Sequence, residues 1–316
     1  MFHLSTALEL IWAALALWGL GCGAGTWLHR VSRLPSWVWL PLVATASCLI
    51  SYLLFFVHFF SPGAGRLAAR LWWLVSLAIF AWCCRAPDTR ERLRQRDAWV
   101  PVLLTVLLTG SFLASAAAMP VVVNDRFRFS LPADNAFPYI FAQHLSNGVY
   151  GAGVPPRLLA DEWRTSDRPP LQAAITLAAL AVHKGDRHVF YQFVSTICQV
   201  GWVGVLYGLG RTIGLPRRHG RVVLLAAASS VFFYLNSIYG WPKLLSAWLF
   251  LFGLTLVMYI VRERGRASDW ILPLAAGAMT LGMLAHTGVG FSVLALPWLA
   301  ACWRPWRIIS IRSAFA

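Results

Sequence analysis

The chain has 316 residues, of which 59% are hydrophobic and 12% are charged, and its mean hydropathy is +0.63. Soluble domains carry about 25% charged residues, so this composition excludes an ordinary soluble globular protein. The formal net charge of +15 does not indicate a nucleic-acid partner, because the arginines lie in short clusters between apolar runs and not along one soluble face.

Long apolar runs recur through the whole chain. A helix needs about 20 apolar residues to cross the hydrocarbon core of a bilayer, and such runs must be helical in lipid because no water is there to bond their backbone. We therefore predict an all-α, polytopic transmembrane bundle of about nine spans plus interfacial helices. A shorter apolar run, Leu171 to Val182, is predicted to enter the membrane without crossing it. The predicted spans are residues 5–27, 36–60, 68–84, 98–119, 188–210, 222–239, 243–261, 270–285 and 289–303.

The number of basic residues alternates from one connection to the next. Of the 27 Lys and Arg residues, 17 lie in five clusters and 10 lie in the alternate connections. Cytoplasmic loops are enriched in Lys and Arg, so the five clusters are predicted to be cytoplasmic. Arginine far outnumbers lysine, which favours a GC-rich bacterial genome, and we expect a multi-pass protein of the bacterial inner membrane. The five clusters lie within residues 30–33, 85–96, 211–221, 262–266 and 304–312.

The connection 120–187 differs from the other connections in length and polarity. It holds six of the twelve Asp and Glu residues and is predicted to be extracytoplasmic. A long polar connection in an otherwise tightly looped bundle is usually functional. A solvated loop without a function is the alternative.

An amphipathic helix is predicted within this loop, in the stretch LPADNAFPYIFAQHLSNG (131–148). Phe137, Ile140, Phe141 and Leu145 recur at helical spacing, and Asn147-Gly148 is a typical helix stop. We expect this helix to lie along the interface with its apolar side towards lipid. That position would hold Asp134 near the level of the headgroups.

A rigid stem follows in DEWRTSDRPPLQ (161–172). The Pro169-Pro170 pair fixes an extended backbone and disfavours helical geometry at Arg168. A charged pair, Asp167-Arg168, just before the chain re-enters the membrane is suited to an anionic headgroup.

This order of features resembles the first periplasmic loop of the C-type (GT-C) membrane glycosyltransferases, especially the aminoarabinose transferases and the protein O-mannosyltransferases. In that family the loop commonly contains Asp-Glu, then Tyr, then Ile-Ala and then Gly, at separate positions in this order. The segment Glu-Lys-Pro-Pro-Leu follows them. The segment 281–298 is similar to the Lys-Gly-Pro segment of the family, with His286-Thr287-Gly288 in its place. The corresponding loop residues here are Asp134-Asn135, Tyr139, Ala142, Gly148 and Asp167-Arg168-Pro169-Pro170-Leu171.

The resemblance covers about residues 120–303 and implies a division of the chain. Residues 1–97 would be extra N-terminal transmembrane helices, and residues 98–316 a GT-C-like module with the extracytoplasmic loop 120–187. The sequence stops near Arg312, short of a typical family member, so we expect an N-terminal part or a truncated form.

The activity implied by the resemblance is transfer of a sugar from a polyprenyl-phosphate donor to an acceptor hydroxyl outside the cytoplasm. Such a transfer needs a carboxylate near the acceptor to take its proton. It also needs cations that stabilise the charge on the departing phosphate. The implied catalytic residue is Asp134, the implied phosphate contact is Arg168, and the further substrate-binding residues are Asp167, Lys243, Tyr139 and His286.

Structural roles remain open for these residues. Asp134 is also in the position of a helix N-cap, and Arg168 can form an ion pair with Asp167 or Glu162. Lys243 can extend its ammonium group to the interface without binding anything, and His286 can be an ordinary interfacial residue.

No cofactor is fixed by the sequence. The six cysteines lie within or at the edges of apolar runs without the spacing of a metal site. A divalent metal held by Asp167 with His286 stays open. The predicted partners are the lipid bilayer and a polyprenyl-phosphate sugar, with no nucleic acid.

Two other classes of function compete with a transferase. One is a transporter or flippase of a lipid-linked substrate, although the chain shows no internal repeat and few charges within its apolar runs, Glu9 being one. The other is a non-catalytic membrane assembly subunit.

Overall fold

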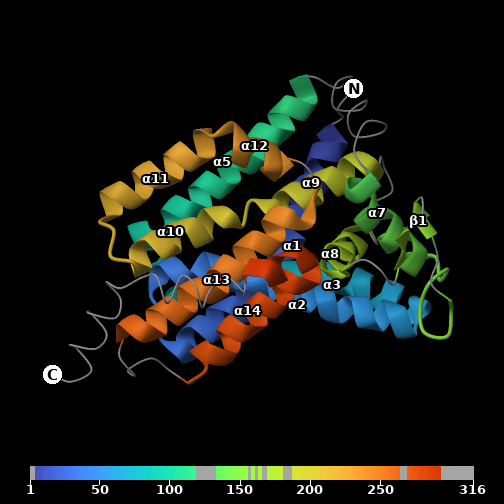
Figure 1. Ribbon diagram of the computed structural model, residues 1–316, viewed down its shortest axis with the longest axis horizontal. Helices are drawn as coiled ribbons and strands as arrows, with labels where there is room; N and C mark the ends of the chain where they lie inside the picture. Colours follow the sequence, from blue (N-terminus) through green and yellow to red (C-terminus); the bar gives the residue numbers. More distant parts are fainter. Residues whose placement is uncertain are drawn as a thin grey trace.

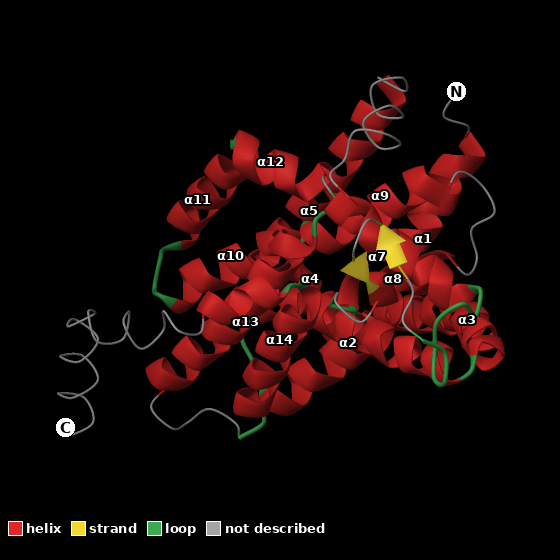
Figure 2. Cartoon of the chain, turned by 45° about the vertical axis from the view of Figure 1, so that its right-hand side comes forward, coloured by secondary structure: helices red, strands yellow, loops and turns green. Residues whose placement is uncertain are grey.

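The computed structural model describes residues 4–118, 133–155, 158–160, 163–165, 169–180, 187–238, 240–263 and 269–292. These residues form α-helices, short 3-10 turns and one small antiparallel hairpin that lies beside α7, so the predicted all-α class is confirmed (Figures 1 and 2). The elements are α1 (Leu4–Ser32), η1 (Ser36–Val38), α2 (Trp39–Phe60), α3 (Pro62–Arg85), α4 (Pro87–Arg94), α5 (Arg96–Ala118), α7 (Ala133–Ser146), β1 (Leu158–Ala160), β2 (Trp163–Arg164), α8 (Leu171–Leu180), α9 (Arg187–Gln199), α10 (Trp202–Thr212), α11 (Arg217–Ser229), α12 (Val231–Ile238), α13 (Pro242–Glu263), α14 (Ile271–Ala285) and η3 (Thr287–Val289).

Four helices of the described part are long enough and apolar enough to cross a bilayer, as expected of a membrane protein. The pair α11 and α12 would add a fifth if it were counted as one span. The prediction of about nine spans is not confirmed, because α8 and α14 have only 10 and 15 residues and the chain beyond residue 292 lies outside the described part. The four helices are Ser36–Phe60, Pro62–Arg85, Phe190–Thr212 and Pro242–Glu263.

The predicted span 222–239 consists of two helices that meet at an angle of 66°. Between them, Ser230 has an extended backbone (φ −73°, ψ 128°), and its N–H bonds the carbonyl of Ala227 at 3.0 Å. Serine hydroxyls compete with helical hydrogen bonding, which makes a break here physically reasonable. The hydropathy pattern gave no sign of the bend, because the residues on both sides of it are apolar.

Helix α1 packs closely against α2 and α3 through four alternate glycines. A Cβ atom on any of them would come within 3.0 Å of an atom of α2 or α3. Glycines four residues apart share one face of a helix, so one pair faces α3 and the other pair faces α2. Small residues at this spacing let membrane helices approach closely. The α3-facing pair is Gly19 and Gly23, and the α2-facing pair is Gly21 and Gly25.

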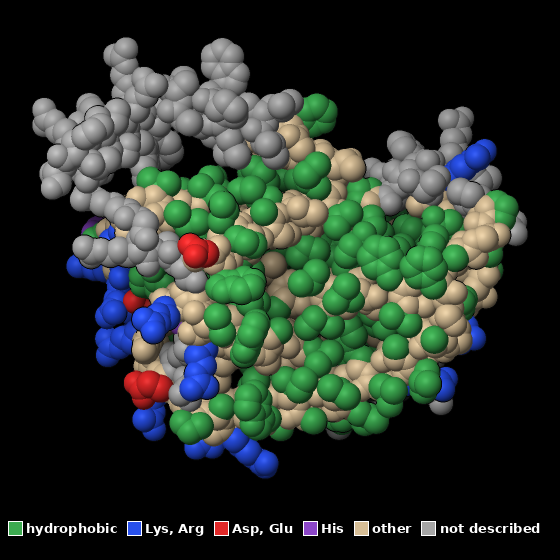
Figure 3. Space-filling model, turned by 90° about the horizontal axis from the view of Figure 1, so that it is seen from below, with side chains coloured by type: hydrophobic (Ala, Val, Ile, Leu, Met, Phe, Trp, Pro, Cys, Tyr) green, Lys and Arg blue, Asp and Glu red, His purple; other side chains and the backbone are tan. Residues whose placement is uncertain are grey.

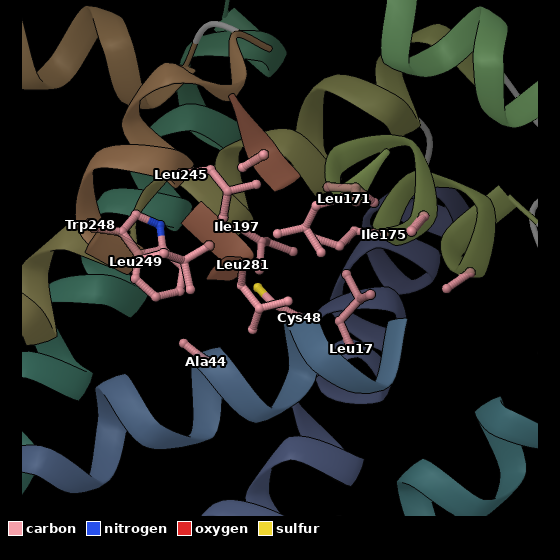
Figure 4. Packing of buried hydrophobic residues seen from close by; sticks show 14 of the residues in the cluster. Leu17, Ala44, Cys48, Leu171, Ile175, Ile197, Leu245, Trp248, Leu249 and Leu281 are labelled. Carbon is pink, nitrogen blue, oxygen red and sulfur yellow. The ribbon is translucent and has the colours of Figure 1, made fainter. Parts of the chain in front are cut away.

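The main hydrophobic core draws on helices from the whole described chain (Figure 4). Leu17 of α1 and Cys48 of α2 lie in the same cluster as Ile175 of α8, Trp248 of α13 and Leu281 of α14. Helix α8 is the most enclosed element, since each of its ten residues is buried. The described parts of residues 1–97 and 98–316 therefore share one core, and the boundary between extra helices and a GT-C-like module stays a prediction.

The basic clusters gather at one end of the bundle, here called the arginine-rich end. Arg30 and Arg33 line a cavity of about 400 Å³ together with residues of α4 and the turn after it. Close by, the guanidinium of Arg211 lies 5.5 Å from the ring centroid of Trp37, and Arg262 donates a hydrogen bond to the carbonyl of Arg211 at 3.1 Å. Described members of four of the five clusters predicted to be cytoplasmic thus share one end, whereas Arg264, Arg266 and the fifth cluster, 304–312, lie outside the described residues.

The surface is apolar between the two ends of the bundle. Figure 3 shows hydrophobic side chains across the middle of one face, with most of the visible Lys and Arg at its left-hand end and a few at its right-hand edge. Large side chains such as Phe60, Leu74 and Trp82 are 70%, 66% and 65% exposed. Soluble monomers rarely expose apolar patches of this extent, so these side chains are expected to contact lipid.

Substitution of Gly21 by alanine is predicted to destabilise the bundle by about 1–3 kcal/mol, a typical cost of overpacking. The new Cβ would lie 1.9 Å from the Ser47 hydroxyl oxygen and 2.4 Å from the Val43 carbonyl oxygen, so α1 and α2 would have to separate. Thermal unfolding in detergent measures the effect. Gly277→Ala is the matched control, because a Cβ there meets nothing within 4 Å. Equal stability of the two variants would contradict the close approach.

Candidate functional site

Helix α7 carries the residue implied to be catalytic. It runs from Ala133 to Ser146 with Asp134 in its first turn, and the chain leaves the helix through Gly148, whose φ is +70°. Glycine adopts this left-handed conformation without strain, which makes it a common residue after a helix end. The predicted helix and its Asn-Gly stop are confirmed. The side chain of Asp134 lies outside what the structure describes.

The apolar face of α7 packs on the protein itself. Phe137, Phe141 and Leu145 are each at most 2% exposed. The Phe141 ring meets the Phe55 ring of α2 edge to face, with centroids 5.9 Å apart. The expectation that this face lies in lipid was therefore wrong, because α2, α3 and α8 cover it. Periodicity identified the buried face of the helix but not what covers it.

The turn between α2 and α3 holds the C-terminal end of α7 and the loop after it. Arg66 donates a hydrogen bond to the carbonyl of Ser146 at 2.8 Å. The Ala152 N–H bonds the carbonyl of Phe59 at 2.7 Å. These contacts fix the C-terminal end of α7. Together with the packing of its apolar face, they hold the whole helix in place, including the first turn that carries Asp134.

Gln172 is the polar centre of this end of the bundle. It is the second residue of α8 and is 1% exposed. Its side-chain nitrogen lies 2.6 Å from the Gly240 carbonyl oxygen, 3.2 Å from the Ser195 hydroxyl oxygen and 3.3 Å from the Tyr191 hydroxyl oxygen. An amide NH₂ group has two hydrogens, so it can satisfy two of these three acceptors at a time. The Tyr191 hydroxyl also donates to the Gly240 carbonyl at 3.3 Å.

Tyr139 connects α7 to this network. Its ring centroid lies 5.5 Å from that of Tyr191, and its hydroxyl accepts a hydrogen bond from Gln143 at 2.8 Å. Tyr139 lies five residues after Asp134, so the helix with the implied catalytic acid is joined to α9 and, through Tyr191, to α8. We call Tyr139, Gln172, Tyr191, Gln192, Ser195 and Gly240 the polar cluster.

The start of α13 is fixed at the same end by Gln199. The side-chain oxygen of Gln199 accepts a hydrogen bond from the Leu245 N–H at 2.6 Å, and its nitrogen donates to the Trp241 carbonyl. Lys243 is exposed, with its ammonium nitrogen 4.2 Å from the centroid of the Trp241 ring. A cation at this distance is attracted by the ring, so this lysine is held over Trp241 at the bundle surface.

His286 lies where α14 ends, close to the start of α13. Its Nδ1 accepts a hydrogen bond from the Gly288 N–H at 3.1 Å, and its carbonyl accepts one from the Ser246 hydroxyl at 3.2 Å. These bonds support the structural interpretation of His286, as the residue that caps η3, and leave its role towards a substrate a prediction.

Two buried amide oxygens of the polar cluster, those of Gln172 and Gln192, have no hydrogen-bond partner in the described structure. A buried acceptor without a donor costs roughly 1–3 kcal/mol. Gly240 packs closely against the cluster, since a Cβ there would lie only 3.1 Å from the Tyr191 hydroxyl oxygen and 3.3 Å from the Gln192 side-chain oxygen.

Asp167 and Arg168 lie outside the described residues. The proline pair after them is described, and the Ala174 N–H bonds the carbonyl of Pro170 at 2.8 Å, so this stem leads directly into α8. Among the described residues no group of three or more His, Cys, Asp or Glu side chains is placed to hold a metal ion. The metal alternative for Asp167 with His286 stays a prediction.

A second polar site, at the arginine-rich end, was not found from the sequence. The side chain of Asp97 is 4% exposed, and its two oxygens accept hydrogen bonds from the Tyr207 hydroxyl at 2.6 Å and the Arg217 Nε at 2.9 Å. An Arg211 nitrogen lies 3.8 Å from the same carboxylate. The sequence contained one indication of this site, an acidic residue at the start of a predicted span that directly follows a run of arginines.

Comparison of the chain with protein-family models, with curated proteins and with solved structures found no match. The GT-C resemblance therefore rests on the residues of the loop and of the segment 281–298.

Replacement of Gln172 by leucine is predicted to destabilise the protein by about 1–3 kcal/mol, because the buried Gly240 carbonyl loses its closest donor. Denaturant or thermal unfolding in detergent gives the value. Gln143→Leu is the control, since Gln143 is half-buried and bonds only the Tyr139 hydroxyl among the contacts described above. A Gln172→Leu variant as stable as the parent would argue against the network.

Replacement of Asp97 by asparagine keeps the side-chain shape but removes the charge that faces Arg217 and Arg211. We expect a loss of about 1–3 kcal/mol in the free energy of unfolding. Glu91→Gln removes an exposed acid that is paired with Arg94, and there we expect a loss of at most about 1 kcal/mol. A double-mutant cycle with Tyr207→Phe measures the coupling, and additive effects would mean that Tyr207 and Asp97 do not act together.

Proposed function

We propose that this chain is a GT-C-like membrane glycosyltransferase of a bacterial inner membrane. It would transfer a sugar from a polyprenyl-phosphate donor to an acceptor hydroxyl at the extracytoplasmic face. Asp134 would take the acceptor proton, and Arg168 would stabilise the charge that develops on the departing phosphate.

The observation that carries this proposal is the convergence of α7 and α8. Tyr139, five residues after Asp134, contacts Tyr191, which shares hydrogen bonds with Gln172, four residues after Arg168. The two loop segments of the resemblance, far apart in the sequence, therefore lead to one polar cluster. Such an arrangement suits a reaction that needs a carboxylate at the acceptor hydroxyl and a cation at the departing phosphate.

The chemistry of the cluster also fits a sugar. The side-chain oxygens of Gln172 and Gln192 are buried acceptors without donors in the described structure, and hydroxyl groups of a sugar are donors of the required kind. Ligand sites typically combine a few such polar groups with an apolar wall.

An apolar cavity of about 430 Å³ supports a lipid-linked donor. It lies among α1, α2, α3, α5 and α9, and its polar lining is small. Ile11 and Val106 on its rim are 49% and 61% exposed, so the cavity opens towards the surroundings of the bundle. Phe193, which lines it, follows the cluster residue Gln192 on α9. A hydrocarbon chain in this cavity would lie against α9, which carries Tyr191, Gln192 and Ser195 of the polar cluster.

Asp134→Asn is expected to lower sugar transfer by at least about 100-fold, a usual effect of losing a general base. Purified protein in liposomes is incubated with a radiolabelled polyprenyl-phosphate sugar and an acceptor extract, and both retained donor and transferred label are counted. Glu91→Gln, an acid-to-amide change on α4 at the arginine-rich end, is the control and should transfer normally.

Unchanged transfer in Asp134→Asn would remove Asp134 from the catalytic role. Movement of the labelled lipid across the bilayer without transfer would favour a transporter. A parent protein that neither retains nor transfers the donor would favour a non-catalytic subunit.

A further inference from the structure

The arginine-rich end carries more positive charge than the described acids compensate. Arg211 and Arg217 approach Asp97, and Arg221 lies within electrostatic range of the Tyr207 hydroxyl bound to the same carboxylate. Arg262 donates to the Arg211 and Thr212 carbonyls at 3.1 Å and 2.9 Å. Glu263 follows Arg262 but forms no ion pair with these arginines in the described structure.

Three basic side chains are crowded at the start of α11. Arg217, Arg218 and Arg221 lie in its first five residues, where the helix dipole already disfavours cations. Arg218 is exposed, and the side chain of Arg217 is 61% exposed. Asp97 occupies one guanidinium closely, whereas Arg218 is exposed and the buried Nε of the half-buried Arg221 has no hydrogen-bond partner in the described structure, so these two arginines have an unmet preference for an anion.

The outer face of α11 combines these arginines with exposed hydrocarbon. Arg218, Val222 and Leu225 lie at i, i+4 and i+7, which places them in one row along the helix. Val222 and Leu225 are 59% and 53% exposed. Only Gly220 and Leu224 of this helix are buried, so the packing of α11 on the rest of the protein leaves this row uncovered.

We propose that this row, together with the neighbouring Arg221, binds an anionic phospholipid. The phosphate lies at Arg218 and Arg221, and an acyl chain lies along Val222 and Leu225. A zwitterionic lipid matches the apolar part of the row but not its net charge, and a free anion matches the charge but not the exposed valine and leucine. A phospholipid with a net negative charge matches both. Juxtamembrane basic residues attract such headgroups in general.

This site is independent of the proposed transfer. Lys243 and Arg262 stand near the two ends of α13, a helix of 22 residues that is about 33 Å long at 1.5 Å per residue. The polar cluster lies near the end of α13 that carries Lys243, and the arginines lie near the end that carries Arg262. Loss of lipid binding and loss of transfer can therefore be measured as separate properties.

The test compares lipid binding by detergent-purified protein. Mixed micelles contain either phosphatidylglycerol or phosphatidylcholine, and bound lipid is counted by native mass spectrometry together with the shift in Tm. We expect phosphatidylglycerol to bind more tightly than phosphatidylcholine and to raise the Tm more. Arg218→Gln and Arg221→Gln should each weaken phosphatidylglycerol binding by about fivefold, the effect typical of one basic residue near a charged surface.

Arg94→Gln is the matched control. It removes one positive charge at the same end, from an exposed side chain that is paired with Glu91, and binding should not change. Equal weakening by Arg94→Gln would show a general charge effect and overturn the site. Inorganic phosphate that displaces phosphatidylglycerol at equal concentration would show a soluble-anion site instead, and equal binding of both lipids would also overturn the proposal. Unchanged Tm values of the variants in phosphatidylcholine micelles confirm that they are folded.

Discussion

The buried amide of Gln172 is the contact on which the α7 end of the molecule depends. Helix α8 is ten residues long and apolar apart from Gln172 and Thr176, so few of its side chains can form directional bonds to the rest of the bundle. A hydrogen bond in an apolar interior is directional and costly to break. The bond to the Gly240 carbonyl therefore fixes α8 against the turn before α13, and the contact between Tyr139 and Tyr191 carries this position on to α7.

The bundle has two chemically different ends, and its close packing keeps them apart. Alternate glycines hold α1 tightly against α2 and α3, and the α1–α2 turn lies beside α4 and α5. At that end one buried carboxylate, Asp97, meets several arginines. At the other end, neutral amides and tyrosines surround buried acceptors. Charge is concentrated where phospholipid headgroups are expected, and hydrogen-bond acceptors are concentrated where the loop 120–187 returns to the bundle.

Local patterns in the sequence were sufficient for several features. The apolar spacing of Phe137, Phe141 and Leu145 predicted α7 and its apolar face, and Asn147-Gly148 predicted its end. The short run after Pro170 was predicted to be too short to cross, and it is the ten-residue helix α8. The alternation of basic clusters along the chain predicted which connections between helices lie together at the arginine-rich end. Each of these depends on neighbouring residues, whose preferences the sequence displays directly.

The sequence by itself determined the helical class, the membrane character and the polarity of the bundle, because hydropathy and charge are properties of the residues themselves. Only the tertiary structure decided that α7 lies on protein rather than lipid, that Gln172 meets Gly240, and that Asp97 meets Tyr207 and Arg217. These contacts join residues 68, 110 and 120 positions apart. Helix rotation and depth set which polar side chains meet, and no pattern within a single helix fixes either quantity.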